Sequence, residues 1–272
     1  MSHAAAVAFR YLAPPRPRVF GHRGAAGVAP ENTLPSFALA AALGAAYLEL
    51  DVHATADGEI VVLHDPTLER TTDGGGPVSA LPWTAAAALD AGYRFTHDGR
   101  SFPYRGQGVR IPRLVEVLAA FPAYRLNIEI KQADPPIVDA VLDVLRRAAS
   151  LDRVLLAAEH DAIMEAIRRT AGDAVATGMC VGDVVDFVGR VSREDWAGYT
   201  APGQALQIPP AHGGIDLVTA ASVAAAHRVG LEVHVWTIND AVEIDRLLDL
   251  GVDGVMSDLP GLVASAVARR AA

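Results

Sequence analysis

The chain has 272 residues, of which 51% are hydrophobic, enough to bury a sizeable core and to exclude an intrinsically disordered protein. Its formal net charge of −9 argues against a nucleic-acid binder that relies on a basic surface, although a few convergent cations would still bind one phosphate. The single cysteine, Cys180, excludes an internal disulfide, so nothing in the sequence requires an oxidising compartment.

The N-terminus lacks the features of a targeting signal. Ala4–Leu12 is mildly apolar, but it is short and contains Arg10, whereas a signal peptide has a basic start and a longer apolar run. No other apolar stretch reaches the roughly 20 residues that cross a bilayer without charges. We therefore expect a soluble, cytoplasmic protein without stable membrane insertion.

Short apolar runs alternate with amphipathic helical patterns along most of the chain. The predicted strands are Val19–His22, Tyr47–Val52, Leu126–Ile130, Val154–Ala158, Val175–Met179, Ala205–Ile208, Glu232–Thr237 and Gly254–Ser257. The predicted helices that follow them run from about Thr33 to Gly44 and over Pro112–Phe121, Pro136–Ala149, Asp161–Ala171, Gly182–Val191, Ala220–Val229, Ala241–Leu250 and Leu262–Arg270. Eight strand–helix units predict an α/β fold with parallel strands. The number favours a closed (β/α)₈ barrel, also called a TIM barrel, over a doubly wound open sheet.

Residues 53–110 interrupt this alternation after the second predicted strand. The pair Asp57-Gly58 between alternating residues indicates a hairpin, and an irregular stretch follows it. We expect one domain over residues 1–272, with 53–110 as an inserted hairpin and loop subdomain. The insertion would leave the C-terminal end of the second strand, which is the face where such barrels carry their active sites.

Three carboxylates are placed to meet at the mouth of such a barrel. Glu49 and Asp51 lie two positions apart on the second strand and share one face, and Glu129 lies on the third strand. The residues flanking Glu49 and Asp51 are apolar, and burying two unpaired acids would be costly, which favours a bound cation. Both Mg²⁺ and Ca²⁺ bind carboxylate oxygens, so the sequence predicts a site for either ion.

Basic side chains and two histidines accompany these acids. Arg23 and Lys131 supply fixed positive charge that suits the oxygens of a phosphate. His22 and His64 follow different strands and can act as general acid and general base on opposite sides of a phosphorus atom. Either histidine alone is more often structural than catalytic, but the combination with a metal and two cations predicts phosphodiester cleavage.

The chain resembles glycerophosphodiester phosphodiesterases in a series of motifs from about Val19 to Pro260. In order these are HRGAAGVAPENT, LELDVHATADGEIVVLHDPTLERTTDG, IPRLVEVL, LNIEIK, VHVWTIND and DGVMSDLP. The resemblance implies a TIM barrel that cleaves a small glycerophosphodiester to glycerol 3-phosphate and an alcohol, with an insertion after the second strand. It also implies His22 and His64 as catalytic residues, Glu49, Asp51 and Glu129 as metal ligands, Arg23 and Lys131 as phosphate contacts, and Trp236 as an aromatic wall for the substrate.

The mechanism that we expect is metal-assisted in-line displacement at phosphorus. One histidine deprotonates the attacking oxygen, for which the glycerol hydroxyl of the substrate is a candidate through a cyclic phosphate, and the other protonates the leaving alcohol. The pair Glu159-His160 departs from the family pattern, which often has Ser-Phe after the fourth barrel strand. We expect Asn32 in the PENT motif to cap the first helix.

Two other functions fit the same pattern. A phospholipase D-type hydrolase or cyclising lyase acting on lysophospholipids would use the same histidines and metal. It would need an apolar entrance, which the aromatic residues of the insertion could supply: Trp83, Tyr93, Phe95, Phe102 and Tyr104. The alternative of another class is a non-catalytic barrel that binds a phosphorylated ligand. Its mark would be the loss of a histidine or an acid, and none is lost.

Overall fold

A computed structural model describes residues 9–271, so the first part of the apolar segment Ala4–Leu12 lies outside the described residues. Within that range eight strands run parallel: β1 (Arg18–Gly21), β2 (Tyr47–Ala54), β4 (Arg125–Ile130), β5 (Val154–Ala157), β6 (Ala176–Thr177), β7 (Ala205–Ile208), β10 (Glu232–Val235) and β11 (Gly254–Ser257). They lie in the order β6-β5-β4-β2-β1-β11-β10-β7, and one parallel bridge between Gly178 and Ala205 joins the two ends. The predicted (β/α)₈ barrel is therefore confirmed, and the open sheet is excluded.

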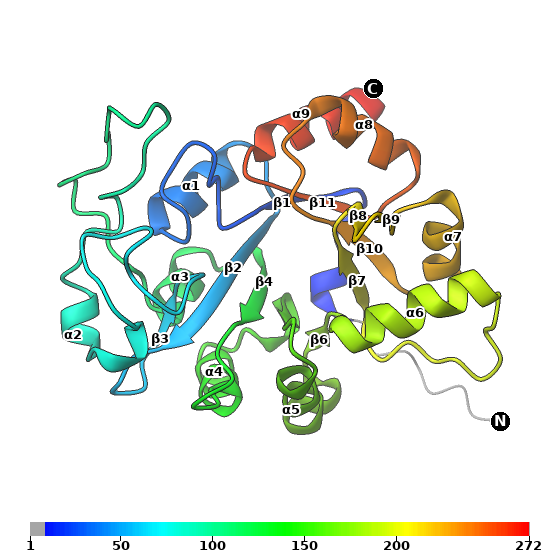
Figure 1. Cartoon of the computed structure of the whole chain (residues 1–272), viewed down its shortest axis with the longest axis horizontal. Coiled ribbons are helices and arrows are strands. Elements are labelled where there is room, and N and C mark those ends of the chain that lie inside the picture. The colour runs from blue at the N-terminus through cyan, green and yellow to red at the C-terminus, as the bar shows by residue number, and fades with distance from the viewer. Residues whose placement is uncertain (1–8, 272) are drawn as a thin grey trace.

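Helices surround this sheet, one after each parallel strand (Figure 1). They are α1 (Leu34–Ala42), α3 (Leu114–Ala120), α4 (Val138–Arg147), α5 (Asp161–Ala171), α6 (Val181–Arg193), α7 (Ala220–Arg228), α8 (Ala241–Asp249) and α9 (Pro260–Ala271). Helix α4 shows why the pattern predicts them, because its buried residues Val138, Val141, Leu142 and Leu145 recur at helical spacing on the face toward the sheet. The main core lies between the strands and these helices. In the described part of the chain, no helix is long and apolar enough to cross a membrane.

Three predicted strands differ by two or more residues from their lengths in the structure, and one of them is β10, which ends at Val235 instead of Thr237. Strand β2 continues two residues past Val52 because the antiparallel strand β3 (Ile60–Val62) pairs with its end, with Ala54 opposite Ile60. His53 and Ala54, which we placed in the insertion, therefore belong to β2. Strand β6 is only two residues long, where Val175–Met179 was expected, because beyond Thr177 the pairing is reduced to the single bridge at Gly178.

The insertion between β2 and α3 contains β3, the 3₁₀ helix η2 (Val78–Ala80) and the short helix α2 (Trp83–Ala86). It lies beside α1 and α3, on the left in Figure 1. The hairpin predicted from Asp57-Gly58 is confirmed, and Gly58 has the positive φ of +84° that favours glycine there. A small apolar cluster of its own stabilises the insertion; it includes Val61, Leu68, Val78 and Ile111.

A second hairpin follows β7 and was not predicted. It consists of β8 (Ala211–His212) and β9 (Ile215–Asp216), joined by Gly213 and Gly214 with φ of +58° and +81°. Two consecutive positive φ angles are typical of the tight turns that match the twist of a hairpin. The strands are too short to show an alternating pattern in the sequence.

Several buried polar side chains fill the N-terminal end of the barrel. The 3₁₀ helix η1 (Arg10–Leu12) places the completely buried Tyr11 inside the barrel, where its hydroxyl donates to Asn127 Oδ1 at 3.2 Å. Arg18, which is 2% exposed, donates from Nε to Glu232 Oε2 at 2.8 Å and from a second nitrogen to Glu232 Oε1. Two further 3₁₀ helices, η3 (Leu151–Arg153) and η4 (Gly172–Ala174), connect outer elements.

Candidate active site

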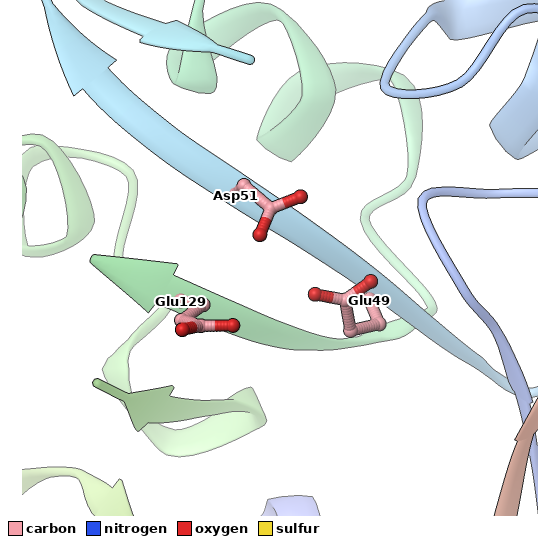
Figure 2. Close-up of side chains that lie close together, drawn as sticks. All are labelled: Glu49, Asp51 and Glu129. Atoms are coloured by element: carbon pink, nitrogen blue, oxygen red, sulfur yellow. The ribbon is translucent and has the colours of Figure 1, made fainter. Parts of the chain in front are cut away.

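The predicted site residues converge at the C-terminal ends of the barrel strands. Glu49 and Asp51 lie on β2 and Glu129 lies on β4, where the strand register places Asp51 directly opposite Glu129. Figure 2 shows the three carboxylates pointing toward one another from these neighbouring strands. One oxygen from each carboxylate lies within 4.8 Å of the others, so the three could hold a metal ion.

Two cations flank this carboxylate cluster. Lys131, directly after β4, has its Nζ 2.8 Å from Glu129 Oε1 and 3.4 Å from Asp51 Oδ1. Arg23, directly after β1 and His22, has its Nε 3.3 Å from Asp51 Oδ2, and its backbone N–H donates to Glu49 Oε2 at 2.9 Å. Positive charge from the two sides therefore concentrates on Asp51.

The pKa values of the carboxyls follow from this distribution of charge. Burial raises the pKa of Asp51, but the nearby Lys131 and Arg23 outweigh it, so the pKa lies below its usual value. Burial and the charge of Asp51 raise the pKa of Glu49 to about 7. Burial also raises the pKa of Glu129. Burial thus opposes the ionised forms of Glu49 and Glu129, and a divalent cation between the carboxyls would favour them.

His22 is held by a carboxylate at one ring nitrogen. Its Nδ1 lies 2.7 Å from Asp258 Oδ1, and its Nε2 lies 4.0 Å from Glu49 Oε2. Asn239 orients Asp258, donating from Nδ2 to Asp258 Oδ2 at 2.6 Å while its Oδ1 accepts the backbone N–H of Asp258 at 2.9 Å. Burial lowers the pKa of His22, but the hydrogen bond with Asp258 and the charge of Glu49 outweigh it, so the pKa lies above its usual value.

His64 has a similar arrangement on the other side. Its Nδ1 lies 2.7 Å from Asp65 Oδ1, and Arg70 donates from Nε to Asp65 Oδ2 at 2.6 Å. Arg70 also donates from Nη1 to Glu31 Oε2 at 2.6 Å, which ties the insertion to the loop between β1 and α1. The hydrogen bonds from Arg70, with a smaller contribution from His64, lower the pKa of Asp65 to about 2.

Several residues that orient this site were not predicted from the sequence to do so. Arg70 and Glu31 belong to the RTT and PENT motifs, which were the only signal for them. Asn32 is not the helix cap that we expected: its Nδ2 donates to Asp51 Oδ2 at 2.9 Å, while Thr33 caps α1 by accepting the backbone N–H of Ser36. Asn32 therefore belongs to the carboxylate cluster, and its backbone has a positive φ of +58°, which asparagine adopts more readily than most residues.

A cavity of about 410 Å³ opens beside His64. The insertion forms one wall with His64, Asp65 and Ser79, and the other wall comes from Lys131, Asp134 and Glu159, which follow β4 and β5. His22 is not among the residues that line it. Trp236, which follows β10, is 41% exposed and lies outside the lining of this cavity.

The aromatic residues of the insertion contact one another or arginine side chains, and none of them lines this cavity. The ring of Phe95 meets the edge of Tyr104 at 5.3 Å, and the guanidinium of Arg105 lies 3.8 Å from the ring centre of Phe102 and 4.1 Å from that of Tyr93. The cavity beside His64 is lined by none of the five aromatic residues of the insertion, Trp83, Tyr93, Phe95, Phe102 and Tyr104.

Residues 22–262 match the model of the glycerophosphoryl diester phosphodiesterase family. A probable glycerophosphodiester phosphodiesterase 2 from Mycobacterium tuberculosis is 29% identical over 244 residues, which cover 89% of this chain and 86% of that protein. Lysophospholipase D GDPD1 from Mus musculus is 28% identical over 269 residues, covering 89% and 83%. A crystallised Oleispira antarctica phosphodiesterase in complex with the product sn-glycerol-3-phosphate superimposes with a TM-score of 0.77 at 28% identity, over 93% of this chain and 97% of that one.

These matches define the class, a phosphoric diester hydrolase, and exclude the non-catalytic barrel as an interpretation. The chain belongs to the glycerophosphoryl diester phosphodiesterase family, as the motifs of the sequence implied.

Proposed function

We propose that this enzyme cleaves glycerophosphodiesters to glycerol 3-phosphate and an alcohol in a metal-dependent reaction, with His22 and His64 as the acid–base pair. The convergence of three carboxylate oxygens within 4.8 Å, next to Arg23 and Lys131, carries this proposal. The glycerol 3-phosphate bound to the Oleispira relative supports a glycerol-containing substrate.

Glu49, Asp51 and Glu129 would hold the cation. An all-oxygen donor set suits a hard divalent ion such as Mg²⁺ or Ca²⁺. Burial and the charge of Asp51 raise the pKa values of Glu49 and Glu129 in spite of nearby cations, and a divalent ion would favour their ionised forms. A bound divalent ion supplies positive charge that neutralises phosphate oxygens as charge develops on them.

Arg23 and Lys131 are placed to bind the phosphate from two sides of the cluster. Their charged groups sit beside Asp51 on opposite flanks, so a phosphate near this carboxylate would meet both. Trp236 is the exposed aromatic side chain after β10, and we assign it to the rim of the substrate site.

The two histidines each keep Nδ1 against a carboxylate and leave Nε2 for chemistry. Asp258 and Asp65 would accept the Nδ1 protons, which selects the tautomer with a free Nε2, and Asp258 also stabilises the imidazolium form of His22. In the proposed reaction one Nε2 takes the proton of the attacking oxygen. The other Nε2 gives a proton to the alcohol oxygen as its bond to phosphorus breaks.

An assay of glycerol 3-phosphate release from a panel of glycerophosphodiesters tests this proposal. We expect EDTA to abolish turnover and Mg²⁺ or Ca²⁺ to restore it. His22→Ala and His64→Ala should each lower kcat by about 10²–10⁴-fold, whereas His97→Ala, at an exposed histidine of the insertion, is the matched control. Unchanged turnover in either variant removes that histidine from the mechanism, and full activity after exhaustive chelation removes the metal.

Hydrolysis of lysophospholipids is the second candidate, because the mouse relative bears the name of a lysophospholipase D. The apolar entrance that it would require is not supplied by the insertion's aromatic residues at the cavity beside His64. Cleavage of glycerophosphocholine without cleavage of lysophosphatidylcholine would exclude this candidate, and a higher kcat/KM on the lysolipid would favour it.

A further inference from the structure

The cavity beside His64 carries unbalanced negative charge. Of the charged residues in its walls, Lys131 is paired with Glu129 and Asp51, and Asp65 is paired with Arg70. Glu159 and Asp134 also line the cavity, and neither carboxylate has an ion pair within residues 9–271. Two solvent-accessible carboxylates without a counter-charge therefore face a space that adjoins the reacting histidine.

The cavity lies on one side of the proposed reaction centre. It is lined by His64 and Lys131, whereas His22 approaches Glu49 and is held by Asp258 from β11's end of the mouth. A phosphodiester bound between the two histidines at the carboxylate cluster would extend one of its two substituents toward His64. The cavity is the space that this substituent would enter.

We propose that the cavity receives the alcohol group of the substrate, with His64 as its proton donor, and that Glu159 and Asp134 make the enzyme prefer an alcohol that bears a primary ammonium group. This inference rests on the proposed function. In the step concerned, the attacking oxygen forms a bond to phosphorus while the bond from phosphorus to the alcohol oxygen breaks. The alcohol oxygen takes the proton from His64 Nε2, and the alcohol leaves with its ammonium group unchanged.

The lining of the cavity favours a primary over a quaternary ammonium group. A primary ammonium donates charge-assisted hydrogen bonds to carboxylates, which a quaternary ammonium cannot do. Quaternary groups are usually bound by a cage of aromatic rings, and no Phe, Tyr or Trp is among the residues that line this cavity. A neutral polyol would gain no charge attraction from Glu159 or Asp134.

The size of the preference follows from Coulomb's law at an exposed site. A carboxylate about 4 Å from an ammonium in a water-like medium increases binding by about fivefold. Two such carboxylates would favour the ammonium-bearing diester over a neutral one by about 10- to 25-fold at low salt. Exposed charges are screened by salt, so the preference should shrink as ionic strength rises.

Three diesters with the same glycerol 3-phosphate half test the inference: glycerophosphoethanolamine, glycerophosphocholine and glycerophosphoglycerol. The measured quantity is the ratio of kcat/KM for the ethanolamine diester to that for the glycerol diester. We expect a ratio of about 10 or more in the wild type, an intermediate value for choline, and a fall of about fivefold in the ratio for Glu159→Gln. Asp134→Asn added to Glu159→Gln should bring the ratio close to 1, and 0.5 M KCl should lower the wild-type ratio.

Glu165→Gln is the matched control, because Glu165 is an exposed acid of α5 outside the cavity lining and loses the same charge. The inference is wrong if the wild type shows no preference among the three diesters. It is also wrong if the double variant lowers kcat/KM equally for all of them, since the cavity would then bind the shared glycerol half. Release of glycerol 3-phosphate from none of the diesters would instead refute the proposed function itself.

Discussion

Replacing Asp258 by Asn should disable His22 while leaving the shape of the site intact. The Oδ1 of Asn239 accepts the backbone N–H of Asp258 and the hydroxyl of Ser257, so its Nδ2 must face the side chain at position 258. An asparagine at that position would turn its own oxygen toward this donor. Its amide nitrogen would then face His22 Nδ1, where Asp258 Oδ1 lies at 2.7 Å in the native enzyme.

The ring of His22 would respond by adopting the other tautomer. Its Nδ1 would become an acceptor and its Nε2 would carry the proton, so Nε2 could not remove one from an attacking oxygen. The stabilisation of the imidazolium by the Asp258 carboxylate would be lost as well, which lowers the pKa of His22 and weakens it as a base. Loss of general acid–base catalysis by one histidine predicts a fall in kcat of about 10²–10⁴-fold.

Steady-state release of glycerol 3-phosphate measures this prediction. We expect kcat to fall with little change in KM, because Asp258 contacts His22, the proposed acid–base group, and has no proposed contact with the phosphate. Asp245→Asn, at a surface aspartate of α8, provides the same chemical change away from the mouth. A kcat for Asp258→Asn within about threefold of the wild type, in a protein with unchanged circular dichroism, would show that Asp258 does not set the tautomer of His22.

Three further predictions concern the support of the site and the barrel. Arg70→Lys should lower kcat by about 10-fold with little effect on KM, because one ammonium cannot reproduce the hydrogen bonds of the guanidinium to Asp65 and Glu31. An unchanged kcat would show that Arg70 does not position His64 through Asp65. Glu232→Gln should destabilise the fold by about 3 kcal/mol at pH 7. Burial alone would raise the pKa of Glu232, but His234 and Arg18 have the larger effect and lower it from 4.5 to about 2, so the ionised carboxylate stabilises the folded state. Since this pKa is depressed in the folded state, the stabilisation by Glu232 is present above pH 4.5 and is lost as the pH falls toward 2. The free energies of urea unfolding of the variant and the wild type should therefore converge near pH 2. A difference that grows on acidification would contradict this. Gly24→Ala should lower the free energy of unfolding by at least about 2 kcal/mol, because Gly24 has a φ of +88° and an added Cβ would lie 2.4 Å from Ser36 Oγ. An unchanged melting temperature would show that the loop adapts freely.

The barrel is predictable from the sequence because its strands and helices have different periods. Buried strands such as Leu126–Ile130 read as short apolar runs, whereas α4 buries residues at helical spacing. The β8–β9 hairpin and the short β6 are not predictable in this way. Their strands are only two residues long, too short to show an alternating pattern, and the length of β6 depends on its pairing with β5 and on the single bridge to β7.

The position of the carboxyls in the proposed metal site is also predictable from the sequence, since residues two apart on a strand share a face. This places Glu49 with Asp51, but the register that sets Asp51 opposite Glu129 is a property of the folded sheet. The orientation of the histidines is less accessible. Arg70 reaches Glu31, 39 positions earlier, only because the insertion folds back over the loop after β1.

The surroundings of the aromatic residues in the insertion are not predictable from the composition of the chain. Their number suggested an apolar entrance, yet Arg105 lies over the rings of Tyr93 and Phe102 and makes them part of a local cluster. The cavity beside His64 is instead lined by polar and acidic residues such as Asp134 and Glu159. Neither the spacing nor the type of these residues reveals which of them share one cavity.

A crystal structure of the enzyme with glycerol 3-phosphate and a divalent metal would test the central claim most directly. We expect one metal ion bound by the carboxylates of Glu49, Asp51 and Glu129, with the phosphate in contact with that ion, Arg23 and Lys131. We also expect the Nε2 atoms of His22 and His64 to face the phosphate from opposite sides. A metal bound elsewhere, or a phosphate that neither histidine approaches, would contradict the assignment of this mouth as a metal-dependent phosphodiesterase centre.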